Sequence, residues 1–108
     1  MHKCKITVLK RHVFSDLAED YAIGGEIPPC PFFKDDYSIT LDANDYNSLR
    51  IPDGFCSQAW DCISHYVYAA VSCGKINDAE WMKDPQIYLA SCNDGLRPVV
   101  FKIEAIEE

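Results

Sequence analysis

GFCSQAWDCISHYVYAAVSC, residues 54–73, is the stretch of this sequence that decides the fold. Its apolar side chains recur at intervals of three or four residues, at Cys56, Ala59, Trp60, Ile63, Tyr66, Val67, Ala70 and Val71. That spacing is typical of an α-helix with one face against a hydrophobic core. Asp53 is a candidate N-cap, and Gly74 suits the position after the last turn. The stretch therefore predicts one long helix that covers an apolar surface.

Apolar and polar residues alternate in short segments on both sides of this helix. These segments are residues 3–8, 37–41, 87–92 and 98–106. Alternation with a period of two is typical of strands with one buried and one wet face. We expect the first and last strands to pair, because both alternate over similar lengths. A short helix is expected at residues 15–22, with Ser15 as its cap.

Together these elements predict an α+β fold. It consists of a small, mainly antiparallel and partly closed β-sheet, packed by one main α-helix at about residues 54–73 plus the short N-terminal helix. The 108 residues contain no repeat or linker and suit a single domain, 1–108. A polar loop is expected at 42–50, and a stiff, proline-rich loop around Cys30.

Composition narrows the classes of function. The net charge of −7 disfavours binding to nucleic acids and to anionic membrane surfaces. No apolar run is long enough to cross a bilayer, and the first residues do not resemble a signal peptide. We therefore expect a cytoplasmic protein with reduced thiols. The motifs of dinucleotide-binding, P-loop, nucleophile-elbow and zincin enzymes are absent, which leaves enzymatic activity open.

Six cysteines are many for this length, and three of them lie where loops and helix ends are expected. Cys30 is flanked by prolines, Cys56 begins the main helix, and Cys92 precedes the turn at 93–95. The positive end of a helix favours the thiolate of Cys56. If these loops meet at one end of the sheet, the three thiols form one site, with Asp94 as a nearby oxygen donor or base.

The leading specific hypothesis is therefore a cysteine-based site formed by Cys30, Cys56 and Cys92. Such a site would bind a soft metal such as zinc, or carry out thiol redox or sulfur chemistry. The other cysteines, at positions 4, 62 and 73, are interpreted as packing residues.

Two alternatives remain open beside the cysteine site. The first is a non-catalytic module that binds a protein partner, with Trp81 or Phe32 and Phe33 as exposed anchors. The second is a small-molecule-binding module with its pocket between the helix and the sheet.

Several blocks of the sequence carry a resemblance. They are KITVLK at 5–10, PCP at 29–31, PDGFC at 52–56, AW at 59–60, WMKDP at 81–85 and CNDGLRPVVFKIE at 92–104. With these blocks in this order, most of the chain resembles a family of small, uncharacterised bacterial and archaeal proteins. The sequence departs from that pattern by extra residues at 42–50, and by Asn93 where many relatives have proline. The resemblance implies no activity, but it places Cys30, Cys56 and Cys92 within the motif blocks.

Overall fold

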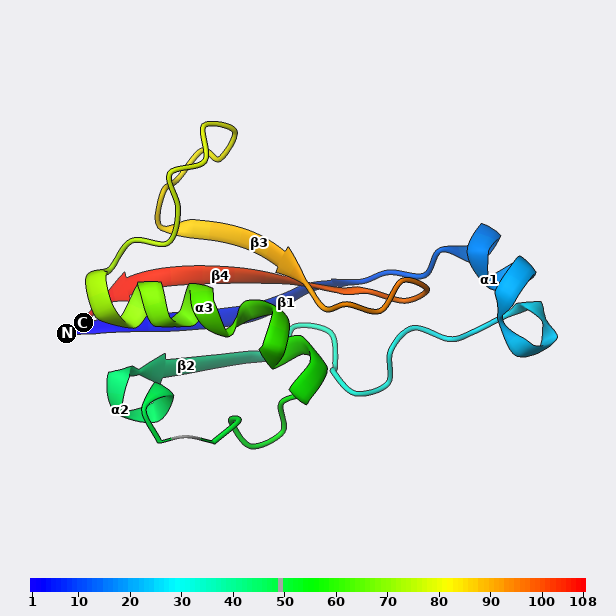
Figure 1. The fold of residues 1–108 in the computed structure, drawn as a ribbon, viewed down its shortest axis with the longest axis horizontal. Helices are drawn as coiled ribbons and strands as arrows, with labels where there is room; N and C mark the ends of the chain where they lie inside the picture. The colour runs from blue at the N-terminus through cyan, green and yellow to red at the C-terminus, as the bar shows by residue number, and fades with distance from the viewer. Residues whose placement is uncertain (49) are drawn as a thin grey trace.

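The computed structural model describes residues 1–48 and 50–108 and shows a four-stranded sheet with one long helix against it (Figure 1). The elements are β1 (His2–Arg11), α1 (Ser15–Tyr21), the 3₁₀ helix η1 (Ile23–Gly25), β2 (Ser38–Asp42), α2 (Ala43–Tyr46), α3 (Ser57–Cys73), β3 (Ile87–Ser91) and β4 (Val99–Glu107). This is the α+β architecture that the sequence predicts.

The sheet has the strand order β2-β1-β4-β3, and every neighbouring pair is antiparallel. The predicted pairing of the first and last strands is confirmed, since Ile6 lies opposite Ile103 in the β1–β4 ladder. The sheet is open rather than partly closed. Its edges are β2 and β3, which pair only with β1 and β4 respectively.

A β-bulge interrupts β1 between Val8 and Lys10. Val8 pairs with the buried Phe101, so strict alternation would turn Lys10 toward the core. The extra residue shifts the register instead, because Lys10 pairs with Val100 and Arg11 with the buried Val99. The bulge therefore sends Lys10 to the uncovered face and Arg11 to the face that carries α3.

Helix α3 begins three residues later than the sequence predicts. Gly54 has a φ of 76°, which excludes it from the helix, and the N-cap is Cys56 rather than Asp53. The end agrees with the prediction, because Gly74 is left-handed with a φ of 72° and its N–H donates to the carbonyl of Ala70.

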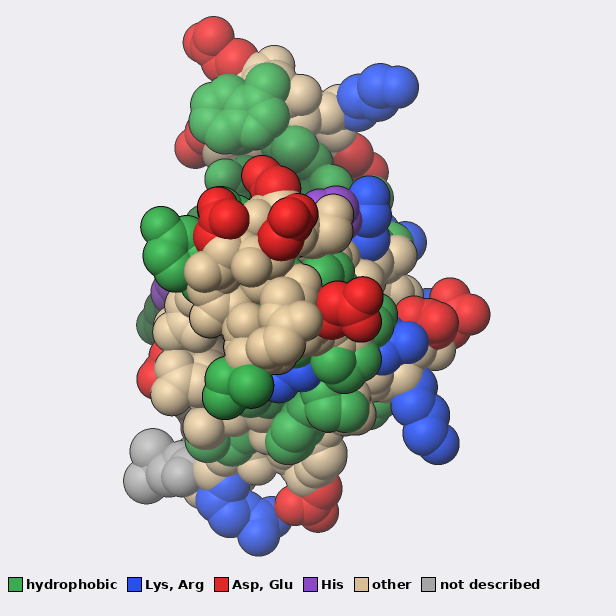
Figure 2. Space-filling model, turned by 90° about the vertical axis from the view of Figure 1, so that its right-hand side faces the viewer, with side chains coloured by type: hydrophobic (Ala, Val, Ile, Leu, Met, Phe, Trp, Pro, Cys, Tyr) green, Lys and Arg blue, Asp and Glu red, His purple; other side chains and the backbone are tan. Residues whose placement is uncertain are grey.

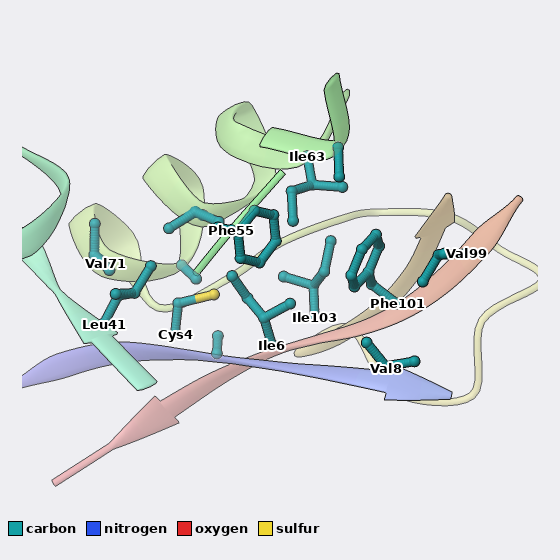
Figure 3. Packing of buried hydrophobic residues seen from close by; sticks show 14 of the residues in the cluster. Cys4, Ile6, Val8, Leu41, Phe55, Ile63, Val71, Val99, Phe101 and Ile103 are labelled. Carbon is teal, nitrogen blue, oxygen red and sulfur yellow. The ribbon is translucent and has the colours of Figure 1, made fainter. Parts of the chain in front are cut away.

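The predicted apolar stripe of α3 is buried on the sheet. Its buried residues are Ala59, Ile63, Val67, Ala70 and Val71. They pack against inward-facing residues of β1, β2 and β4, as Figure 3 shows for Cys4, Ile6, Val8, Leu41, Phe101 and Ile103. A loop residue, Phe33, completes this core, with its ring centroid 5.1 Å from that of Phe55 and 5.2 Å from that of Phe101.

The two short helices differ in how well the sequence predicts them. Helix α1 lies where the short N-terminal helix is expected, although the residue before it, Phe14, makes no side-chain cap. Helix α2 lies in the expected 42–50 loop, whose position 49 falls outside the described residues. Asp42 and Asp45 form a capping box there, with two hydrogen bonds of 2.9 Å. None of the described helices is both long and apolar enough to span a membrane.

Replacing Ile63 with alanine should lower the free energy of unfolding by about 2–5 kcal/mol, because it removes a fully buried side chain on the sheet-facing side of α3. Urea denaturation measures the change. The exposed Asp61→Ala on the same helix is the matched control, and its effect should stay within about 0.5 kcal/mol. Equal effects of the two substitutions would contradict the assignment of the buried face.

Cys4 should make the protein sensitive to alkaline pH. Burial, with a smaller contribution from Glu104, raises the pKa of its thiol to about 12. An unfolded chain releases this proton from about pH 8.5 upward, so stability present below that pH is lost as the pH rises toward 12.

Between about pH 9 and 10.5, the wild-type protein should lose up to about 1.4 kcal/mol per pH unit more than Cys4→Val. Urea titrations at several pH values measure this difference, with the exposed Cys73→Ser as control. Parallel pH profiles of the wild type and Cys4→Val would show that the thiol is not shielded.

Candidate functional site

Three cysteine-bearing segments meet at one end of the sheet, which we call the loop end: residues 28–33, residues 56–58 and the hairpin 92–98 (Figure 1). Asn93 Nδ2 donates to Gln58 Oε1 at 2.9 Å, which joins the hairpin to the first turn of α3. Arg97 Nη1 donates to the carbonyl of Pro28 at 3.4 Å, which joins the hairpin to the proline-rich loop. These two hydrogen bonds join the three segments at the loop end, which is the condition that the hypothesis of a shared cysteine site required.

Cys92 follows β3 and faces the side of the sheet that packs under α3. Its backbone N–H donates to the carbonyl of Val99 at 3.1 Å, and its Sγ accepts the N–H of Val99 at 3.3 Å. The side chain is half-buried against the core. The Val99 amide therefore holds the sulfur at the base of the hairpin.

Cys56 is the N-cap residue of α3 and is also half-buried. Its carbonyl accepts the N–H of Trp60 at 2.9 Å, as the first hydrogen bond of the helix. Its side chain makes no capping hydrogen bond, so the thiol is not engaged by the free amides of the first turn.

Cys62 belongs to this region, although sequence reasoning assigns it to packing. Burial raises the pKa of its thiol, and the nearby charges of Cys92, Asp61 and Cys56 raise it further, in that order. Cys62 therefore lies close enough to Cys56 and Cys92 for negative charge on either sulfur to raise its pKa. The sequence signal was its position at the edge of the apolar stripe, four residues before Tyr66, whose ring lies 4.8 Å from that of Tyr88 in β3.

Cys30 lies on the other side of the hairpin base, beside Arg11. The Arg11 guanidinium donates to the backbone carbonyl of Cys30 at 3.0 Å and to Asp35 at 2.9 Å. Because Val99 pairs with Arg11 and also hydrogen-bonds Cys92, the three residues form one row across the core face of the sheet. Arg11 thus lies beside Cys30, with its charge paired to Asp35, and Val99 separates it from Cys92.

Asp94 holds the hairpin rather than facing the thiols. Its Oδ1 accepts the backbone N–H groups of Leu96 at 2.8 Å and Arg97 at 3.1 Å. The Leu96 hydrogen bond, above all, lowers the pKa of Asp94. A carboxyl group with a lowered pKa is a weak base, so Asp94 fits a positioning role better than the expected role as a base.

The remaining two cysteines differ from each other. Cys4 is fully buried, as the packing interpretation expects. Cys73 is exposed at the far end of α3, where its Sγ donates to the carbonyl of Ala69 at 3.1 Å, so its assignment to packing was wrong. All six cysteines are free thiols in the structure.

No preformed metal centre occurs within residues 1–48 and 50–108, because no three His, Cys, Asp or Glu side chains are placed to hold one ion. The expected soft-metal site would therefore require the thiols to move. The pocket expected between helix and sheet corresponds to packed side chains (Figure 3). One hollow of about 370 Å³ lies instead beside β2, lined by Thr40, Asn44 and Pro52 among others.

Of the three aromatic residues expected as exposed anchors, two are exposed and one is buried. Trp81 is 76% exposed and Phe32 is 52% exposed, whereas Phe33 is buried in the core. The prediction for Phe33 was wrong because Phe55 and Phe101 together offer it an apolar site.

Comparison with protein-family models, curated proteins and solved structures found no significant match. The resemblance to small bacterial and archaeal proteins therefore stays a prediction.

Replacing Cys92 with serine should lower the pKa of Cys62, because it removes one of the charges that raise it. The rate of alkylation at Cys62, measured against pH by peptide mass spectrometry, gives the midpoint. Cys73→Ser, at the far end of α3, should leave that midpoint unchanged. A midpoint that responds to neither substitution would show that Cys62 and Cys92 titrate independently.

Proposed function

We propose that the protein carries out reversible thiol chemistry at the loop end, in the reducing environment of the cytoplasm. The observation that carries this proposal is the set of hydrogen bonds among Gln58, Asn93, Arg97 and Pro28, which holds the cysteine-bearing segments together. A thiol site needs such a frame, because two sulfurs react only when the backbone brings them within bonding distance.

In this proposal Cys92 is the attacking thiol. Its Sγ already accepts the Val99 N–H at 3.3 Å, and Arg11 lies in the same row of the sheet. The hydrogen bond fixes the position of the sulfur, and the thiolate is the form in which a cysteine attacks. Half-burial leaves the sulfur accessible to a small reactant.

Cys62 is the second thiol. Burial and neighbouring charges raise the pKa of Cys62, which disfavours its thiolate, so Cys62 takes the second step of the exchange. Cys56, which also raises the pKa of Cys62, is the third member of the cluster. Cys30 and Arg11 border the cluster on the side of the proline-rich loop.

The chemistry is thiol–disulfide exchange with a small organic disulfide. The Cys92 thiolate attacks one sulfur of the disulfide, the S–S bond breaks, and the leaving thiolate takes a proton from water. Cys62 then loses its proton to solvent and attacks Cys92 Sγ, which releases the second small thiol. Two electrons pass from the protein dithiol to the disulfide, so that one disulfide forms as another is reduced.

Titration of the reduced protein with glutathione disulfide tests the proposal. We expect the loss of two free thiols and a new cross-link between Cys92 and Cys62, detected by mass spectrometry of the non-reduced, alkylated protein. Cys92→Ser should abolish this cross-link, whereas Cys73→Ser should leave it unchanged. Mixed disulfides confined to the exposed Cys73 would contradict the proposal.

Recognition of a protein partner is the second candidate function, and the exposure of Trp81 is the observation that favours it. Its indole is 76% exposed in the loop between α3 and β3. Large exposed aromatic side chains often anchor protein interfaces. Trp81→Ala should leave disulfide formation unchanged while it weakens a partner complex, so the two functions are separable by experiment.

A further inference from the structure

An arm, residues 13–28, projects beyond the loop end and contains α1 and η1 (Figure 1). Two backbone hydrogen bonds hold its base to the hairpin, from His12 N to Pro98 O and from Phe14 N to Leu96 O, each at 2.9 Å. Beyond that base, the main contact of α1 with another element is with η1. At its other end, Arg97 Nη1 donates to the carbonyl of Pro28 at 3.4 Å, so the contacts with the body lie at the two ends of the arm rather than along α1.

A helix as short as α1 needs tertiary packing, because helix nucleation costs free energy that its few hydrogen bonds do not offset. Within its seven residues only Ala18 is buried. Apolar side chains face solvent instead, since Tyr21 is 78% exposed and Ile23 is fully exposed. A hollow of about 540 Å³, lined by Val13, Ala18 and Ile27 among others, adds further unfilled apolar surface. The arm is therefore shaped for contact with another surface.

The negative charge of the arm indicates what kind of partner surface would complement it. Its charged residues are Asp16, Glu19, Asp20 and Glu26, and it contains no lysine or arginine. Figure 2, which looks onto this end of the molecule, shows carboxylates next to hydrophobic side chains. A complementary partner surface is basic and partly apolar.

The uncovered face of the sheet has that character. Four of the seven lysines in the chain lie on it, at Lys3, Lys5, Lys10 and Lys102. Lys3 is ion-paired with Glu108 at 2.9 Å and Lys102 with Glu104 at 3.2 Å, whereas Lys5 and Lys10 form no ion pair among the described residues. Leu9 at the bulge and Leu89 on β3 are 49% and 45% exposed beside them. The part of the face around Lys5 and Lys10 is thus basic and partly apolar in a chain whose net charge is −7.

We propose that the acidic arm of one copy docks on the lysine-bearing sheet face of a second copy, and that the exchange is reciprocal. The chain carries both complementary surfaces, and β1 connects them, because Lys5 and Lys10 lie on the strand that leads into the arm. A two-fold dimer then pairs the arm of each copy with the sheet face of the other, so that both surfaces of both copies are covered. Tyr21 and Ile23 provide the apolar contact, and the lysines face Glu19 and Asp20.

Charge reversal with mixing tests the dimer in reducing buffer. One variant reverses the arm (Glu19→Lys, Asp20→Lys), and the other reverses the face (Lys5→Glu, Lys10→Glu). Each alone places like charges together, so each should raise the dimer dissociation constant at least about tenfold. In the mixture, the positive arm meets the negative face and the negative arm meets the positive face. Mixing should therefore restore a dimer that neither variant forms alone.

Analytical ultracentrifugation across about 1–100 µM protein measures the association. Circular dichroism confirms folding, and recovery on mixing itself requires two folded variants. Ile23→Ser should also weaken the dimer, because a fully exposed side chain contributes nothing to the monomer. The control, Glu80→Lys with Lys83→Glu in the α3–β3 loop, should leave association unchanged. A monomeric wild type, unaffected reversal variants, or a mixture that stays monomeric would overturn the proposal.

Discussion

The antiparallel pairing of β1 with β4 is the interaction on which the rest of the structure depends. It brings together the two ends of the chain, as the hydrogen bond of 2.7 Å from the N-terminal amine to Glu107 shows. Closing so long a loop costs chain entropy, which burial along the ladder offsets. Ile6 and Ile103 are opposite each other and fully buried, and α3 packs on the surface that they create. Each edge strand then needs only one partner in this central pair.

The bulge in β1 gives the two faces of the sheet different chemistry at the loop end. It turns Arg11 toward the proline-rich loop, where its guanidinium holds the carbonyl of Cys30. The same shift keeps Lys10 on the uncovered face. One inserted residue therefore places Arg11 against the Cys30 loop, paired with Asp35, and places Lys10 on the opposite face. The aromatic contacts of Phe33 with Phe55 and Phe101 fix the loop over that region.

Burial and hydrogen bonding, rather than residue type, distinguish the six thiols. Cys4 is shielded completely, and its pKa rises to about 12. Cys92 is half-buried but receives an amide N–H on its sulfur. Cys62 lies near other ionisable groups that disfavour its own charge. The proposed thiol exchange relies on these differences in burial and hydrogen bonding.

The sequence by itself determined the elements whose patterns are local. The stripe of α3 appears in the spacing of Ala59, Ile63 and Val67, and the strands appear in their alternation, because helix and strand periods depend only on backbone geometry. The stop at Gly74 follows for the same reason, since only glycine adopts a positive φ without strain. The meeting of three loops at one end was only a condition at that level, because the full strand order comes from the tertiary structure.

Only the tertiary structure decided which side chains share that end. Cys62 lies near Cys56 and Cys92 because α3 packs against β3, a contact between distant segments that no local pattern encodes. Phe33 is buried because Phe55 and Phe101, distant in sequence, leave a place for it. Asp94 accepts hydrogen bonds from backbone N–H groups of the hairpin, and the direction of these groups depends on the turn. Such outcomes arise from packing between segments far apart in the chain, where shape and burial override local preference.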